Sequence, residues 1–93
     1  MVSVRFWVYG RVQGVGFRYA AAEEAKRLGL GGWCANHPER GDLVLGEVEG
    51  PPEAVAAFLK WLERGPRLAR VERVEREAVP PRHFSGFEIR RGL

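Results

Sequence analysis

The stretch GRVQGVGFR, residues 10–18, joins two segments of different character and decides how this chain folds. Residues 2–9 before it are β-branched and aromatic, with apolar side chains alternating onto one face, which predicts a β-strand. Residues 17–28 carry apolar side chains at helical spacing, which predicts an α-helix starting at about residue 17 or 18. The stretch is therefore a loop with three glycines that runs from a strand into the start of a helix.

This loop has the chemistry of an anion site. Its glycines allow consecutive backbone N–H groups to converge, and the start of the helix adds unpaired donors and a positive dipole end. Arg18 adds a forked guanidinium that can bind two phosphate oxygens. The Walker A pattern is absent, and Tyr19 stands where the dinucleotide pattern requires glycine. From the loop alone, an anion site and a glycine-rich turn with a surface arginine are both open.

A second motif, GWCAN at residues 32–36, lies downstream. The loop has the form Gly-x-Val-Gln-Gly-Val-x-Phe-Arg and resembles the phosphate-binding signature of acylphosphatases. The second motif fits the Gly-aromatic-x-x-Asn segment of the same family, and the likeness covers nearly the whole chain. Two features depart from the family pattern. Ala35 replaces a longer polar residue, and the turn within residues 36–43 is longer by about two residues.

The resemblance implies a hydrolase that cleaves acyl phosphates to a carboxylate and inorganic phosphate. The leaving group is good, so the enzyme must mainly hold the phosphoryl group, neutralise its charge and aim a water in line. The implied roles are water orientation by Asn36 and proton uptake by a phosphate oxygen of the substrate, with no metal or other cofactor. The implied phosphate-binding residues are Gln13, Gly14, Val15, Gly16, Phe17 and Arg18.

Each candidate residue also has a purely structural interpretation. By residue type, Arg18 is a surface residue of a helix and Asn36 begins a turn. We interpret His37 and His83 as surface or edge residues, and Cys34 as a small buried hydrophobe. Only the joint pattern of the two motifs favours Arg18 and Asn36 as catalytic residues.

The remaining elements complete a β-α-β-β-α-β order with a short extra strand at the C-terminal end. The interval 69–79 fits either periodicity, and we expect a strand from about Glu72 to Val79 because two prolines follow it. The order matches an α+β, ferredoxin-like sandwich with two helices on one face of an antiparallel sheet. The other expected segments are strands at about residues 30–36, 43–49 and 84–91 and a helix at about 52–64.

Length and composition limit the number of domains, the kinds of cross-link or metal site, and the cellular location that we expect. A chain of 93 residues predicts one domain over residues 1–93. The single cysteine excludes an internal disulfide. Together with the two histidines of the chain, it gives too few ligands for a zinc site. No apolar run approaches the roughly 18 residues of a membrane span, and no signal peptide is visible. We therefore expect a cytoplasmic monomer without a membrane partner, and the scarcity of Asn and Gln fits a thermophilic composition.

The alternative function class is a single-stranded RNA-binding module on the same fold. The chain carries a net charge of +3, and Arg5, Trp7 and Tyr9 alternate toward what would be the open sheet face. However, the glycine–aromatic tract lies in a loop instead of a central strand, which disfavours nucleic acid as a partner. A further alternative is a related domain used in carbamoyl-phosphate chemistry within a larger enzyme. The short length of the chain argues against this alternative.

Overall fold

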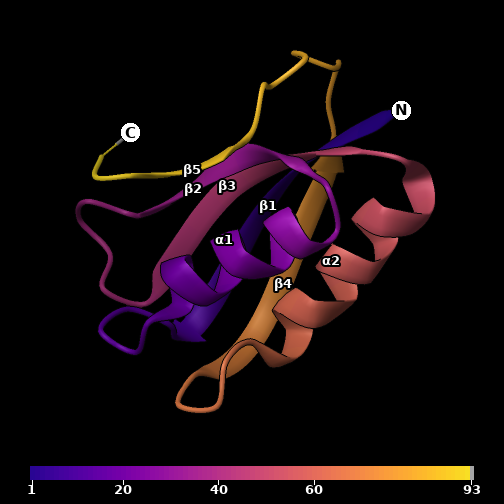
Figure 1. Ribbon diagram of the computed structural model, residues 1–93. Helices are drawn as coiled ribbons and strands as arrows, with labels where there is room; N and C mark the ends of the chain where they lie inside the picture. Colours follow the sequence, from indigo (N-terminus) through magenta and orange to yellow (C-terminus); the bar gives the residue numbers. More distant parts are fainter. Residues whose placement is uncertain (93) are drawn as a thin grey trace.

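The computed structural model describes residues 1–92, with two helices packed on one face of a five-stranded sheet (Figure 1). The strands run across the sheet in the order β4-β1-β3-β2-β5. The predicted ferredoxin-like order of elements is confirmed. The elements are β1 (Val2–Arg11), α1 (Phe17–Arg27), β2 (Gly31–Asn36), β3 (Leu43–Gly50), α2 (Pro52–Arg64), β4 (Arg70–Ala78) and β5 (Phe87–Arg90).

One strand pairing differs from the expected antiparallel sheet. β1 pairs antiparallel with β3 and β4, and β2 pairs antiparallel with β3, but β5 runs parallel to β2. The chain leaves β4 at the end of the sheet where β2 begins, because Val4 of β1 pairs there with Ala78. Crossing that end through residues 79–86 brings β5 alongside β2 in the same direction. The sheet is therefore mixed, and β5 forms its edge.

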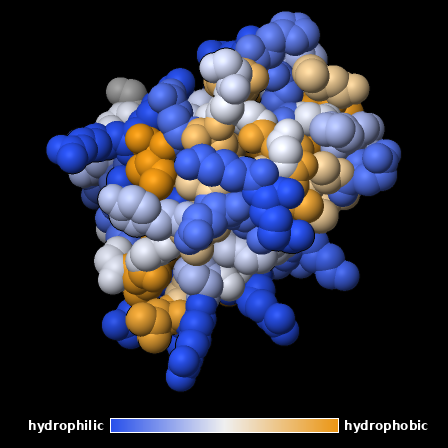
Figure 2. Space-filling view, viewed as in Figure 1, coloured by the Kyte–Doolittle hydropathy of each residue, from blue (hydrophilic) through white to orange (hydrophobic). Residues whose placement is uncertain are grey.

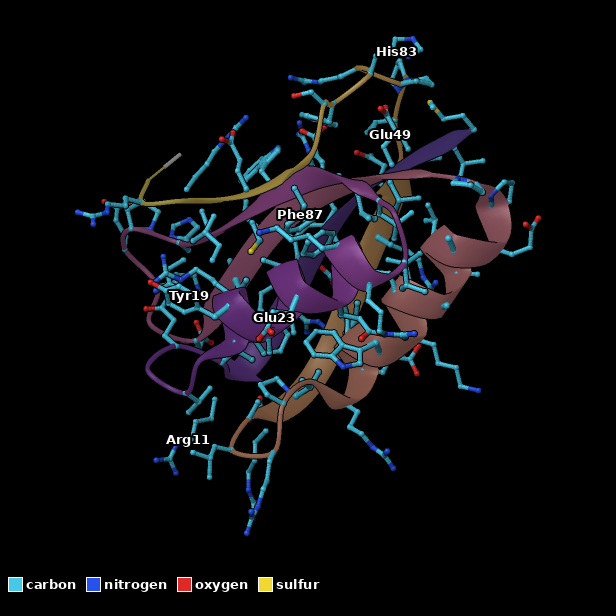
Figure 3. The ribbon with its side chains drawn as sticks, in the orientation of Figure 1. Arg11, Tyr19, Glu23, Glu49, His83 and Phe87 are labelled. Carbon is cyan, nitrogen blue, oxygen red and sulfur yellow. The ribbon has the colours of Figure 1, made fainter. Side chains whose placement is uncertain are left out.

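The hydrophobic core fills the space between the helices and the sheet. Phe58 of α2 lies at its centre, with its ring centroid 5.7 Å from that of Phe6 in β1 and 5.9 Å from that of Phe87 in β5. Figure 3 shows Phe87 directed from β5 toward the helices. Phe17, the first residue of α1, is buried against Trp61 of α2 at 5.7 Å. This contact fixes the start of α1 and hence the position of the residue that follows Phe17.

The surface over the helices is mostly polar. Figure 2 shows hydrophilic side chains across this face, with hydrophobic atoms confined to separate small patches. None of the helices in residues 1–92 has the length and hydropathy needed to cross a membrane.

Candidate active site

The glycine loop enters α1 through two left-handed residues. Gly14 has φ 75° and Gly16 has φ 76°, a region that residues with a side chain rarely occupy. A Cβ at either position would meet nothing within 4 Å, so the requirement for glycine is conformational. Gly16 is the N-cap of α1, and no side chain caps the helix there. Because the first N–H groups of a helix have no acceptor within it, the loop presents donors at the positive end of the dipole.

Arg18 lies in the first turn of α1 and is held from two strands. Its Nη1 donates to the backbone carbonyl of Arg90 in β5 at 3.5 Å, and its own carbonyl accepts the thiol of Cys34 in β2 at 3.7 Å. Cys34 is fully buried, and burial raises the pKa of its thiol to about 12 although the Arg18 guanidinium acts in the opposite sense. The thiol therefore stays protonated at neutral pH, which agrees with the interpretation of Cys34 as a small buried residue.

Asn36 is the last residue of β2 and pairs with Val44 of β3. The next backbone N–H, that of His37, donates to the carbonyl of Leu43 at 3.0 Å. The longer turn therefore begins beyond Asn36 and leaves it in the ladder. Ala35 is also paired in the ladder, but side chains alternate along a strand, so it faces the other side of the sheet from Asn36. The longer turn thus leaves Asn36 in its place in the ladder, and the Ala35 side chain lies on the opposite face of the sheet.

The two motifs meet in one open pocket. Arg18 from α1 and Asn36 from β2 line it together with Tyr19, Ile89 and Arg91, and its volume is about 500 Å³. The Oδ1 atom of Asn36 is buried and accepts no hydrogen bond from any group in residues 1–92. Within the described part of the chain, the lining holds two guanidinium groups and no carboxylate. A pocket of similar volume, about 550 Å³, lies between α1 and α2 and contains residues of neither motif.

The side chain of Gln13 is directed away from this pocket. Its Nε2 donates to the carbonyl oxygens of Arg40 at 2.7 Å, Leu43 at 3.0 Å and His37 at 3.4 Å, all in or beside the turn between β2 and β3. A contribution of Gln13 to phosphate binding thus falls to its backbone. The other loop residues predicted for phosphate binding, Gly14, Val15, Gly16 and Phe17, precede Arg18 directly in the chain but do not line the pocket.

Three pocket residues were not identified from the sequence. Tyr19 follows Arg18 directly, so its position beside the site was available from the motif itself. Ile89 and Arg91 reach the pocket because β5 pairs with β2. That pairing has no local signal in the sequence.

The open sheet face does carry Arg5, Trp7 and Tyr9, as the RNA-binding alternative requires. However, the guanidinium of Arg73 lies 4.2 Å from the centroid of the Tyr9 ring. Arg5 is paired at 2.9 Å with Glu47, whose side chain is buried. Arg5 and Tyr9 thus already have partners within the protein, so the face does not favour nucleic acid over a purely structural role. Among residues 1–92, no cluster of three or more His, Cys, Asp or Glu side chains could hold a metal.

Comparisons with known proteins agree with the geometry. The acylphosphatase family model matches residues 4–89. The chain is 50% identical to an acylphosphatase of Pseudomonas paraeruginosa over 90 residues, covering 97% of both sequences. Its structure is similar to that of acylphosphatase from Bacillus subtilis, with TM-score 0.90, 32% identity, and 96% and 98% of the two chains covered. It is also similar to part of T. kodakarensis HypF, with TM-score 0.82 and 32% identity over 97% of this chain but 12% of that one. The family match and the relatives that it resembles over their full length establish that this chain belongs to the acylphosphatase family.

Proposed function

We propose that this acylphosphatase hydrolyses acyl phosphates by direct in-line attack of water, with Arg18 and the glycine loop holding the phosphoryl group and Asn36 orienting the water. One observation carries the proposal: Arg18 and Asn36, which are 18 positions apart in the chain and lie on different elements, line the same pocket. No metal takes part in the proposed mechanism, because protein groups supply the positive charge.

The phosphoryl group is the part of the substrate that gains most from this arrangement. In phosphoryl transfer, charge is spread over the equatorial oxygens, and fixed donors aimed at those oxygens lower the barrier. Arg18 offers a planar fork of donors, and its Nη1 contact with the carbonyl of Arg90 limits the rotation of that fork. The uncapped start of α1 adds backbone donors from the neighbouring residues.

Asn36 is suited to orient the nucleophile. Its buried Oδ1 has no partner in residues 1–92 and can accept a hydrogen from water. A neutral amide does so without repelling or capturing the anionic substrate. The water oxygen bonds to phosphorus, the bond from phosphorus to the acyl oxygen breaks, and the carboxylate departs with that electron pair. The proton of the water passes to a phosphate oxygen, because no carboxylate among residues 1–92 lines the pocket to accept it.

One copy of the chain supplies both motifs, so we propose that the single domain acts as a monomer. We also propose a cytoplasmic location, because a chain with a single cysteine suits a reducing compartment. The site needs no residue from a second copy, since the pocket is lined by α1, β2 and the end of the chain around β5.

Phosphate release from benzoyl phosphate, measured with and without a chelator, tests the proposed function. We expect turnover by the purified protein and no loss of rate when EDTA is added. If EDTA abolished turnover and a divalent ion restored it, the metal-free mechanism would be wrong. If the protein released no phosphate under either condition, the proposed activity itself would fail.

A further inference from the structure

We propose that Tyr19, Ile89 and Arg91 form a subsite for the acyl group, and that this subsite favours a flat acyl group carrying a second negative charge. The inference rests on the proposed function, because it assigns the part of the same pocket that Arg18 and Asn36 leave unassigned. All five residues line that pocket.

The exposure of the lining residues gives the pocket a direction. Arg18 and Asn36 are half-buried, and the Oδ1 atom of Asn36 is buried completely. Tyr19 and Arg91 are exposed, with Tyr19 at 66%. A phosphoryl group held by the inner residues would therefore direct the rest of the substrate outward, past the exposed ones. The acyl group is the only part of an acyl phosphate that remains to fill that space.

The three residues left for the acyl group combine apolar surface with a positive charge. Tyr19 projects from the first turn of α1 (Figure 3). Ile89 of β5 adds an aliphatic surface to the same pocket. An aromatic ring stacks favourably on another flat group, whereas it gains little from a small acyl group such as acetyl. The subsite therefore suits a planar acyl group.

Arg91 places a second guanidinium in the pocket, although the proposed reaction uses only that of Arg18. Two positive charges in one pocket repel each other, and an anion bound between or beside them offsets that repulsion. No carboxylate of residues 1–92 pairs with Arg91, whereas its neighbour Arg90 is paired with Glu88 at 3.0 Å. A carboxylate on the far side of the acyl group is the planar anion that a guanidinium fork binds best. The chemical class predicted here is thus a monophosphorylated dicarboxylic acid with a rigid, flat body.

The test compares substrates that differ only in the acyl group. The probes are acetyl phosphate, benzoyl phosphate, and 3- and 4-carboxybenzoyl phosphate. The variants are Arg91→Gln, Tyr19→Ala and, as a matched charge control, Lys60→Gln on the exposed face of α2. Ratios of kcat/KM between substrates remove the different leaving-group strengths, because each variant is compared with the original protein on the same pair.

We expect Arg91→Gln to lower kcat/KM for at least one carboxybenzoyl phosphate about fivefold more than for benzoyl phosphate, the scale of one exposed ion pair. We expect Tyr19→Ala to lower kcat/KM for benzoyl phosphate about fivefold more than for acetyl phosphate. Lys60→Gln should leave both ratios as they are. At high salt the effect of Arg91 should shrink, because salt screens an exposed charge pair.

Two results would overturn the subsite. Equal losses on all substrates in Arg91→Gln would mean that Arg91 acts on the phosphoryl group or through long-range charge. An unaltered ratio between benzoyl and acetyl phosphate in Tyr19→Ala would mean that the ring does not contact the acyl group. Failure of the proposed function looks different from either, because the unsubstituted protein would then hydrolyse none of the four probes.

Discussion

The side-chain nitrogen of Gln13 lies 3.0 Å from the carbonyl oxygen of Leu43, and this contact ties the glycine loop to the first residue of β3. The same nitrogen donates to the carbonyl of Arg40 at 2.7 Å. A second tie runs beside it, since the backbone N–H of Gly10 donates to the carbonyl of Asp42 at 2.9 Å. The loop that precedes Arg18 and the turn that follows Asn36 are therefore held together as one unit.

Replacing Gln13 with Ala should lower kcat without a matching loss of phosphate affinity. The amide then no longer fixes the turn after Asn36, and misplacing a catalytic group by about 1 Å can cost roughly 100-fold in rate. We expect a fall in kcat of about tenfold to 100-fold, measured by phosphate release from benzoyl phosphate, and a change in the inhibition constant of phosphate of less than about threefold.

Gln13→Glu is the matched variant, because it keeps the shape and removes the two N–H donors. A carboxylate facing the carbonyls of Arg40 and Leu43 should repel them, so this variant should be at least as impaired as Gln13→Ala. Near-normal kcat in Gln13→Glu would show that the contact does not position the site.

Local patterns were sufficient for most of the fold. The alternation in β1 placed Phe6 and Val8 in the core, and both are fully buried. The ambiguous interval 69–79 is a strand, as expected, although β4 begins at Arg70, two residues before the expected start. Each of these predictions depends on neighbours within one element, where the periodicity of side chains decides the outcome.

What the sequence could not provide was the direction of β5. That direction depends on the irregular segment 79–86, which is anchored by the carboxylate of Glu49. In the sequence, Glu49 is one more glutamate at the end of a strand, with no mark of its buried role. The same limit hid Arg91, because its place in the pocket follows from the pairing of β5 with β2.

Asn36→Ala should lower kcat strongly and leave the fold intact. The buried Oδ1 has no partner in residues 1–92, so removing it breaks no internal hydrogen bond of that atom. If Asn36 orients the water, we expect a loss of about 100-fold or more in kcat, with inorganic phosphate inhibiting nearly as before. Turnover close to normal, or a large fall in thermal stability with little kinetic effect, would leave Asn36 with a structural role at the end of β2.

Glu49 makes the stability of the protein depend on pH at the acidic end. Its carboxylate is buried and accepts the backbone N–H groups of Arg82 at 2.7 Å and Phe84 at 3.0 Å, below the loop tip at His83 (Figure 3). Burial alone raises the pKa of Glu49, but these hydrogen bonds outweigh it and lower the pKa below its ordinary value of 4.5. A lowered folded-state pKa stabilises the protein above the unfolded-state pKa, and that contribution is lost as the pH falls through the folded-state value.

Glu49→Gln should therefore lower the free energy of unfolding by about 1–3 kcal/mol at pH 7, the scale of a hydrogen bond to a charged group. The difference from the original protein should begin to shrink as the pH falls below the ordinary glutamate pKa, and it should approach zero only below the lowered folded-state pKa of Glu49, where that carboxyl group is neutral. Urea unfolding at pH 7, 5 and 3 measures it, with the exposed Glu77→Gln as control. A difference that stayed constant over this range would mean that the charge of Glu49 contributes nothing.

Arg18 is the residue on which the proposed site depends most. Losing one preorganised donor to a transition-state oxyanion typically costs roughly 100- to 1000-fold in rate, and Arg18→Ala should cost at least that much in kcat/KM. Phosphate should also inhibit this variant less, because the guanidinium contacts the ground state as well as the transition state. Arg11→Ala is the control within the same motif, since Arg11 is exposed and Figure 3 shows its side chain directed away from the body of the protein.

Arg18→Lys separates geometry from charge. Lysine keeps the positive charge, but it replaces a planar fork with a point donor and cannot both contact the carbonyl of Arg90 and span two phosphate oxygens. We therefore expect Arg18→Lys to recover little of the activity lost in Arg18→Ala, both measured by phosphate release from benzoyl phosphate. Near-normal activity in Arg18→Lys would mean that Arg18 acts through long-range charge attraction and not through bidentate binding of the phosphoryl group. Near-normal activity in Arg18→Ala would remove Arg18 from the site, and with it the reason for placing the phosphoryl group at the start of α1.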